Sequence, residues 1–180
     1  MAADKQTGGN GSTKPASDQK ATTGVGDQTA AGPSMQVLGQ YIRDLSFENP
    51  NAPASLQQQQ KGQPKLDIDI KIEVRQVADK VHEVTLHLEN RLAIEASVLF
   101  NLELSYAAAF QIEHMPPEMM HQVLRVQCPT LMFPFLRRLV ADLTRDGGFP
   151  PLYLDPIDFA QLYMREMSKT AKTEGRQAKS

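Results

Sequence analysis

The chain of 180 residues contains a single cysteine, no tryptophan and only 6% aromatic residues. Because a disulfide needs two cysteines, Cys128 cannot form one within the chain, which is typical of a protein from a reducing compartment. No apolar run approaches the ~20 residues that span a bilayer, and the amino terminus lacks the roughly 7–15-residue apolar stretch of a secretory signal. The sequence therefore predicts a cytoplasmic protein without direct membrane insertion.

Catalytic and cofactor-binding motifs are missing as well. The sequence contains no HExxH or CxxC metal-binding spacing, no GxxxxGK[ST] or GxGxxG phosphate loop and no GxSxG nucleophile turn. Cys128 precedes a proline in an apolar stretch, which favours a buried structural thiol over a nucleophile. We therefore expect no enzymatic activity, no cofactor and no metal site.

Excess positive charge is absent from the part of the chain that can fold. Residues 35–167 contain 12 Lys and Arg against 17 Asp and Glu, a net charge of −5, whereas residues 168–180 carry +3. A negatively charged body disfavours nucleic acid as the main partner and mildly favours a basic protein partner.

The composition divides the chain into three parts. Residues 1–34 are mostly Gly, Ala, Ser, Thr, Lys, Asp and Gln without apolar periodicity, and residues 168–180 are similar. Such segments bury too little apolar surface to offset the entropy of ordering, so both are predicted to be disordered. Residues 35–167 are predicted to form one compact domain.

Hydrophobic alternation predicts four strands in that domain. It is strict over 65–76, approximate near 38–47, and continuous over 81–90 and 91–106. One buried and one wet face is typical of an antiparallel sheet, and the last three strands are expected to form a meander. The proline- and glutamine-rich segment 50–64 is expected to be a functional loop.

After Phe110 the period changes to that of helices. A short helix is predicted after Pro116–Pro117, a longer one over 129–146, kinked by Pro134, and a last one over 157–167. Cys128–Pro129 is expected to interrupt the first two, and Gly147–Gly148 to end the second with a positive φ. Because the strands precede the helices, the sequence predicts an α+β fold, a four-stranded antiparallel sheet with helices packed on one face.

The helix over 129–146 has more apolar side chains than one buried stripe requires. A stripe at i, i+3, i+4, i+7, i+8 and i+11 would cover the sheet, and Leu131 and Phe133 lie off it. Another subunit or the preceding short helix could bury the excess, and the pattern leaves both possibilities open. The stripe consists of Met132, Phe135, Leu136, Leu139, Val140 and Leu143.

A second apolar surplus follows this helix. Aromatic and methionine side chains on a proline-rich linker and a last helix suit a surface that accepts varied apolar sequences, and ordinary core packing explains them equally well. They are Phe149, Leu152, Tyr153 and Leu154 in the linker, and Phe159, Leu162, Tyr163 and Met167 in the helix.

Three segments resemble the SecB family of protein-export chaperones. They are 44–53 (DLSFENPNAP), 128–135 (CPTLMFPF) and 148–159 (GFPPLYLDPIDF), and the resemblance extends over essentially all of 35–167. It implies a homotetramer, a dimer of dimers, without ATPase activity. It also implies a cytoplasmic molecular chaperone that binds unfolded precursor proteins through apolar grooves, keeps them competent for translocation and delivers them to the SecA motor.

The resemblance also implies roles for individual residues. The client-binding grooves would be lined by the loop 50–64, the linker 149–156 and the last helix, and SecA would contact an acidic surface of the sheet. The implied client-binding residues are Phe47, Leu56, Phe149, Leu152, Tyr153, Leu154, Phe159, Leu162, Tyr163 and Met167. The implied SecA-binding residues are Asp44, Glu48 and Glu103. The implied oligomer interface consists of Leu102, Leu104, Tyr106, Phe133, Leu136, Leu139, Val140 and Leu143.

A second hypothesis uses the same fold for another purpose. The chain could be a non-export oligomeric α+β binding protein, such as a chaperone associated with a toxin–antitoxin system. Both hypotheses predict a tetramer, so the size of the assembly does not separate them. Binding to an unfolded secretory precursor, but not to its folded form, would.

Overall fold

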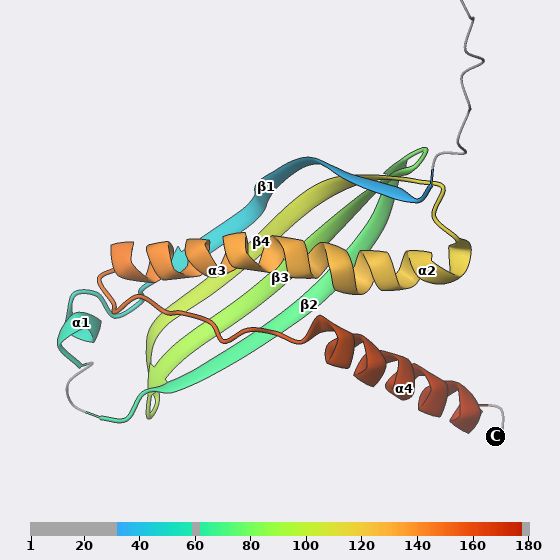
Figure 1. Cartoon of the computed structure of the whole chain (residues 1–180). Helices are drawn as coiled ribbons and strands as arrows, with labels where there is room; N and C mark the ends of the chain where they lie inside the picture. Colours follow the sequence, from blue (N-terminus) through green and yellow to red (C-terminus); the bar gives the residue numbers. More distant parts are fainter. Residues whose placement is uncertain (1–31, 59–61, 178–180) are drawn as a thin grey trace, which may run out of the picture. The chain divides into compact units, whose positions relative to one another are not determined.

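A four-stranded antiparallel sheet forms the centre of the protein in the computed structural model, which describes residues 32–58 and 62–177 (Figure 1). The strand order is β1-β4-β3-β2, so the last three strands form the predicted meander, while β1 crosses over to pair with β4. The strands are β1 (Ser34–Glu48), β2 (Lys65–Ala78), β3 (Val81–Ile94) and β4 (Ser97–Glu113). The predicted sheet is confirmed, with β3 ending at Ile94 rather than at residue 90.

The two faces of the sheet differ as strict alternation predicts. The inner face lies under the helices and carries apolar rows, such as Ile70, Leu88 and Leu104, which are register partners on β2, β3 and β4. Leu88 and Leu104 are each 1% exposed and belong to the hydrophobic core. The outer face carries mostly charged and polar side chains.

Two of the four register shifts among the described strands explain where the predicted alternation fails. Register shifts leave Arg43 as an extra residue in β1 and Leu99 as an extra residue in β4. A bulge re-aims the side chain of the extra residue, and Leu99 accordingly joins the core with 0% exposure.

The helical part begins as one continuous run, formed by α2 (Pro117–Gln122), the π-helical turn η1 (Val123–Gln127) and α3 (Cys128–Asp146). The expected interruption at Cys128–Pro129 is wrong. Pro129 has no N–H for the carbonyl four residues earlier, and the N–H of Cys128 bonds to the carbonyl of Val123, five residues earlier. Because α2 continues into α3, it cannot fold back to cover it.

α3 lies across the inner face of the sheet (Figure 1), where Met132, Leu136 and Val140 are fully buried. The predicted stripe is wrong at one point, because Phe133 is 7% exposed and Phe135 is 45% exposed. The ring of Phe133 packs edge-on against Phe159 of the last helix at 5.8 Å, a contact that local periodicity does not reveal. Phe135 remains uncovered.

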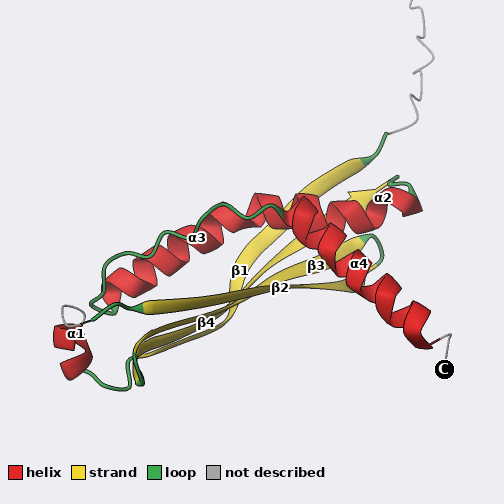
Figure 2. Ribbon diagram, turned by 90° about the horizontal axis from the view of Figure 1, so that it is seen from below, coloured by secondary structure: helices red, strands yellow, loops and turns green. Residues whose placement is uncertain are grey.

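Two further helices complete the fold, as Figure 2 shows from below. The short α1 (Ala54–Gln58) lies in the loop after β1, and α4 (Phe159–Gln177) is longer than the predicted helix 157–167. Residues 1–31 and 178–180 lie outside the described residues. No described helix is both long enough and apolar enough to span a membrane.

Candidate functional site

An apolar groove lies where one end of the sheet meets the segment after α3. Its hollow has a volume of about 270 Å³. The floor comes from inner-face residues of β2, β3 and β4, and one wall comes from the proline-rich linker. The lining residues, which define the apolar groove, are Pro64, Leu66, Leu92, Leu99, Phe100, Phe149, Pro150, Pro151 and Leu152.

A cluster of three phenylalanines supports this groove. The rings of Phe47 and Phe149 lie 5.5 Å and 4.9 Å from that of Phe100. A Cβ on Gly147 would overlap the ring of Phe47, so only glycine lets the turn after α3 sit on that ring. The next glycine, Gly148, has a φ of 86°, which fits the predicted helix-ending role.

Hydrogen bonds fix the linker wall and the loop after β1. Thr144 on α3 is fully buried, and its hydroxyl accepts a hydrogen bond from the backbone N–H of Leu152 at 2.9 Å. The same hydroxyl donates to the carbonyl of Val140 at 2.9 Å. On the other side, the amide of Asn51 donates to the carbonyl of Val98 at 2.9 Å and holds the loop after β1 against β4.

The implied client-binding residues do not form one site. Phe149 and Leu152 line the groove, and Phe47 packs beside it. Leu154 and Phe159 are only 3% and 2% exposed, because they belong to the core of the protomer.

The remaining implied positions, and the floor of the groove, lie elsewhere in the fold. Tyr153 is 66% exposed and borders a separate hollow beside α3, and Met167 is 56% exposed on α4. Leu162 and Tyr163 are half-buried in the same helix, and Leu56 lies on α1 near Gly148. Four residues of the groove floor were not predicted from the sequence. Alternation places three of them, Leu66, Leu92 and Phe100, on the inner face and could have identified them, whereas Leu99 breaks the alternation.

The outer face is acidic at the end of the sheet that carries the groove on its inner face. Asp69, Glu89 and Glu103 are register partners in one row across β2, β3 and β4. Of the implied SecA-binding residues, Glu48 pairs with Asn101 and Asp44 with Ser105, so both point outward on the same face as Glu103.

Ion pairs compensate this acidic face only in part. Lys71 lies 2.9 Å from Asp69 and 3.3 Å from Glu89. Among the described residues, Asp44, Glu48 and Glu103 form no ion pair, so the field of this region stays negative and attracts a basic surface. We refer to these six residues, Asp44, Glu48, Asp69, Lys71, Glu89 and Glu103, as the acidic face.

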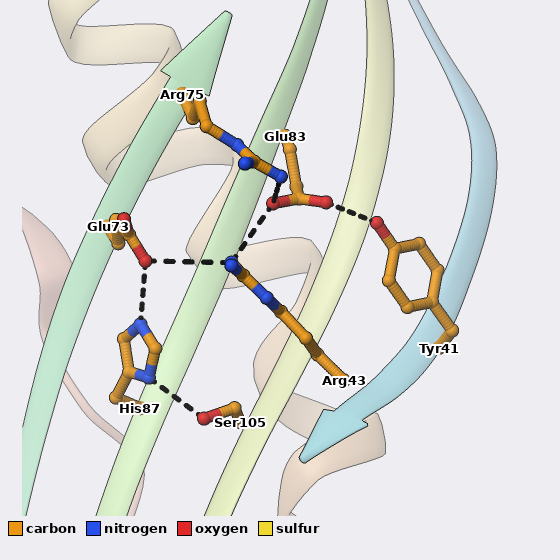
Figure 3. Close-up of polar contacts among 7 residues, drawn as sticks. All are labelled: Tyr41, Arg43, Glu73, Arg75, Glu83, His87 and Ser105. Carbon is orange, nitrogen blue, oxygen red and sulfur yellow. Dashed lines mark hydrogen bonds and ion pairs between the residues drawn. The ribbon is translucent and has the colours of Figure 1, made fainter. Parts of the chain in front are cut away.

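The opposite half of the outer face carries a connected polar network (Figure 3). The carboxylate of Glu83 on β3 accepts hydrogen bonds from Tyr41 and Arg43 of β1 and from Arg75 of β2. The bulge in β1 aims Arg43 across the small alanines of β4 toward this carboxylate. Glu83 therefore joins β1, β2 and β3, and its contacts with β1 pass across β4.

The network continues along the sheet through three further side chains. Glu73 on β2 lies 3.6 Å from Arg43 and 3.0 Å from His87, and the other ring nitrogen of His87 lies 2.9 Å from the hydroxyl of Ser105. The hydrogen bond from Tyr41, followed by the charges of Arg75 and Arg43, holds the pKa of Glu83 below its usual range, although burial opposes this shift. The same bond is the largest cause that raises the pKa of Tyr41.

We expect Glu83→Gln to destabilise the sheet by roughly 1–3 kcal/mol near neutral pH, because it weakens charge-assisted hydrogen bonds. A lowered folded-state pKa means that the stabilisation is present above the pKa of the unfolded chain and is lost as the pH falls through the folded-state value. Urea unfolding at neutral and acidic pH should show the gap to the wild type closing in acid. The exposed Glu89→Gln is the control, and a pH-independent gap would contradict this account.

A groove on one face of the sheet and an acidic surface on the other define a binding protein of the α+β class. Residues 28–170 match the family model described as "Preprotein translocase subunit SecB". A protein-export protein SecB from Rhodopseudomonas palustris (strain BisB5) is 47% identical over 149 residues, which cover 83% of this chain and 94% of that protein. The chain belongs to the SecB family, whose members are non-enzymatic protein-export chaperones.

Other similar proteins agree with this assignment. A protein-export protein SecB from Afipia carboxidovorans is 48% identical over 153 residues, covering 85% of this chain and 94% of that protein. The structure of a SecB-like chaperone from Mycobacterium tuberculosis, solved with a peptide from an antitoxin, is similar with a TM-score of 0.56 at 18% identity. That alignment covers 68% of this chain and 90% of the other, and it supports the fold alone.

Proposed function

We propose that this protein is a cytoplasmic chaperone that holds unfolded precursor proteins in its apolar groove and delivers them to SecA. The observation that carries the proposal is the groove itself, which is apolar, walled by prolines and phenylalanines, and open on the inner face. Binding through apolar area requires no particular client sequence. The names of relatives with 47% and 48% identity favour export over the toxin–antitoxin alternative.

We also propose the tetramer, a dimer of dimers. Its support is apolar surface that one protomer leaves uncovered. On the edge strand β1, Leu38 is 49% exposed and Ile42 is 44% exposed, and a long edge strand invites pairing with a second copy. On α3, Leu131 is 47% exposed beside Phe135. Several grooves in one assembly would add their weak affinities for one long client.

The burial of the implied interface residues shapes this proposal. Leu102, Leu104, Leu136 and Val140 are at most 1% exposed, and Tyr106 and Phe133 are 7% exposed. They would therefore pack beneath the subunit contact without reaching the partner subunit. The half-buried Leu139 and Leu143 would contact the partner at the edge of the interface. Leu131 and Phe135 would provide its centre.

The chaperone proposal is tested with an unfolded secretory precursor diluted from denaturant. We expect the purified protein to slow its refolding and to suppress light scattering from its aggregates, and we expect no binding to the folded precursor. A protein that did neither, while binding an antitoxin peptide, would support the toxin–antitoxin alternative instead.

Delivery to the motor predicts a charge-dependent contact with SecA. Reversing the charge at Glu103 should weaken SecA binding roughly tenfold, because a like charge would face a basic partner. Glu103→Lys should leave client binding unchanged, since the groove lies on the opposite face. The control is Glu118→Lys, which makes the same charge reversal at an exposed position on α2, outside the sheet. Equal SecA affinities for the two variants in titration calorimetry would contradict the contact.

A further inference from the structure

One buried polar side chain interrupts the apolar inner face. Asn90 on β3 is 3% exposed, and neither Nδ2 nor Oδ1 has a hydrogen-bond partner among the described residues. Its register partners are Ile68 on β2 and Leu102 on β4, both apolar. Buried amide groups are almost always hydrogen-bonded, so an orphaned donor and acceptor in one side chain call for a partner that the protomer lacks.

The side chain of Asn90 belongs to the groove side of the sheet. Glu89 and Arg91 flank it and point to the outer face, so Asn90 points to the inner face. Asn90 also borders a hollow on the outer face, beside Glu89 and Glu103. Two residues further along β3, Leu92 forms part of the groove floor. Two residues of a strand span roughly 6–7 Å, so the amide lies just beyond the end of the groove lining.

The inner face is uncovered on the β2 side of Asn90. Leu66, which lines the groove, is 36% exposed, and the next inner-face residue on this edge strand, Ile68, is 46% exposed. Leu102, on the other side of Asn90, is fully buried. A segment that continues from the groove over Leu66 and Ile68 would therefore reach Asn90 from the edge.

The chemistry of the carboxamide indicates which groups of this segment it would bind. Its N–H and carbonyl groups complement those of a peptide bond, whereas an apolar side chain could use neither. The apolar walls of the groove also leave the main-chain groups of a bound segment without partners, which weakens binding. We propose that Asn90 is a positioning residue that hydrogen-bonds the main chain of an extended polypeptide segment held in the apolar groove.

This inference rests on the proposed chaperone function and sharpens it. It assigns part of the recognition to a group that every polypeptide carries, so the contact does not depend on the client sequence. It also explains why a polar residue occupies this buried position. An apolar side chain of similar shape would make the protomer more stable, because it would remove an unpaired polar group from the core.

The test combines protein variants with changes in the ligand main chain. The probe is a fluorescein-labelled extended peptide rich in Leu and Phe, together with derivatives in which one peptide bond at a time is replaced by an ester. An ester removes the N–H donor and weakens the carbonyl acceptor without changing the side chains. The proteins are the wild type, Asn90→Leu and Asn90→Val, with Asn101→Leu as a control that removes an amide from the outer face.

For the wild type and for Asn101→Leu, we expect an ester at one or two positions to weaken binding about fivefold, the range of one hydrogen bond. For Asn90→Leu and Asn90→Val, the same esters should change the affinity less than twofold. Both Asn90 variants should also unfold at higher urea concentration than the wild type, which confirms that they fold.

Two results would overturn the inference. An ester effect of the same size in the Asn90 variants would show that another group binds the main chain, and an absence of any ester effect in the wild type would show that the main chain is not bound by hydrogen bonds. Failure of the wild type to bind even the parent peptide would overturn the proposed function as well, so the two failures are distinguishable.

Discussion

Replacing Phe135 by Asp on α3 is expected to break the proposed tetramer into smaller species while leaving the protomer folded. Phe135 is 45% exposed and Leu131, one helical turn earlier, is 47% exposed, so the protomer does not need either side chain for its core. Burying a phenylalanine at a subunit contact is worth about 1.5–3 kcal/mol per copy, and a carboxylate there would have to lose its hydration without gaining a partner. Symmetry repeats the defect in every subunit.

Light scattering after size-exclusion chromatography, over a range of protein concentrations, measures the effect. Leu139→Asp is a second variant, since Leu139 lies one turn after Phe135 and is half-buried. Gln122→Asp introduces the same charge at an exposed polar position on α2 and should remain tetrameric. Far-UV circular dichroism should be unchanged in all three. If Phe135→Asp and Leu139→Asp both stayed tetrameric, α3 would not be the subunit contact.

The strands and their faces could be predicted because both depend on local periodicity. Strict alternation over 65–76 in β2 specifies which side chains point inward without reference to any other strand. The bulge at Arg43 shows the limit of this reasoning. An extra residue shifts the parity of the residues before it, here Gly39–Ile42, so Tyr41 points outward although Leu45, of the same parity, points inward.

The candidate site was harder to predict because it depends on strand order and on contacts between distant segments. The floor of the groove combines Leu66, Leu92 and Phe100, which become neighbours only when β3 lies between β2 and β4. The Tyr41–Glu83 bond similarly spans from β1 to β3 across β4. Burial of Phe133 in place of Phe135 depends on where α4 packs. A single helix sequence does not contain that information.

Leu152 and Tyr153 allow a direct test of the groove, because these neighbours in the linker border different hollows. Leu152 is half-buried in the apolar groove, and Tyr153 is 66% exposed beside α3. We expect Leu152→Asp to weaken the binding of an unfolded precursor tenfold or more, since a charge placed among apolar groups loses hydration that no partner replaces. Tyr153→Asp should change the affinity less than about twofold, because its side chain stays in water.

The two variants control for each other, since each adds one carboxylate to the same linker. Fluorescence anisotropy with a labelled precursor kept in its unfolded state measures affinity, and urea unfolding checks that both variants are stable. Light scattering should show that both keep the assembly of the wild type, so that a loss of affinity cannot come from a loss of avidity. If Tyr153→Asp proved the more damaging variant, clients would bind along α3 rather than in the groove. That result would support the sequence-based prediction that Leu152 and Tyr153 belong to one client-binding surface.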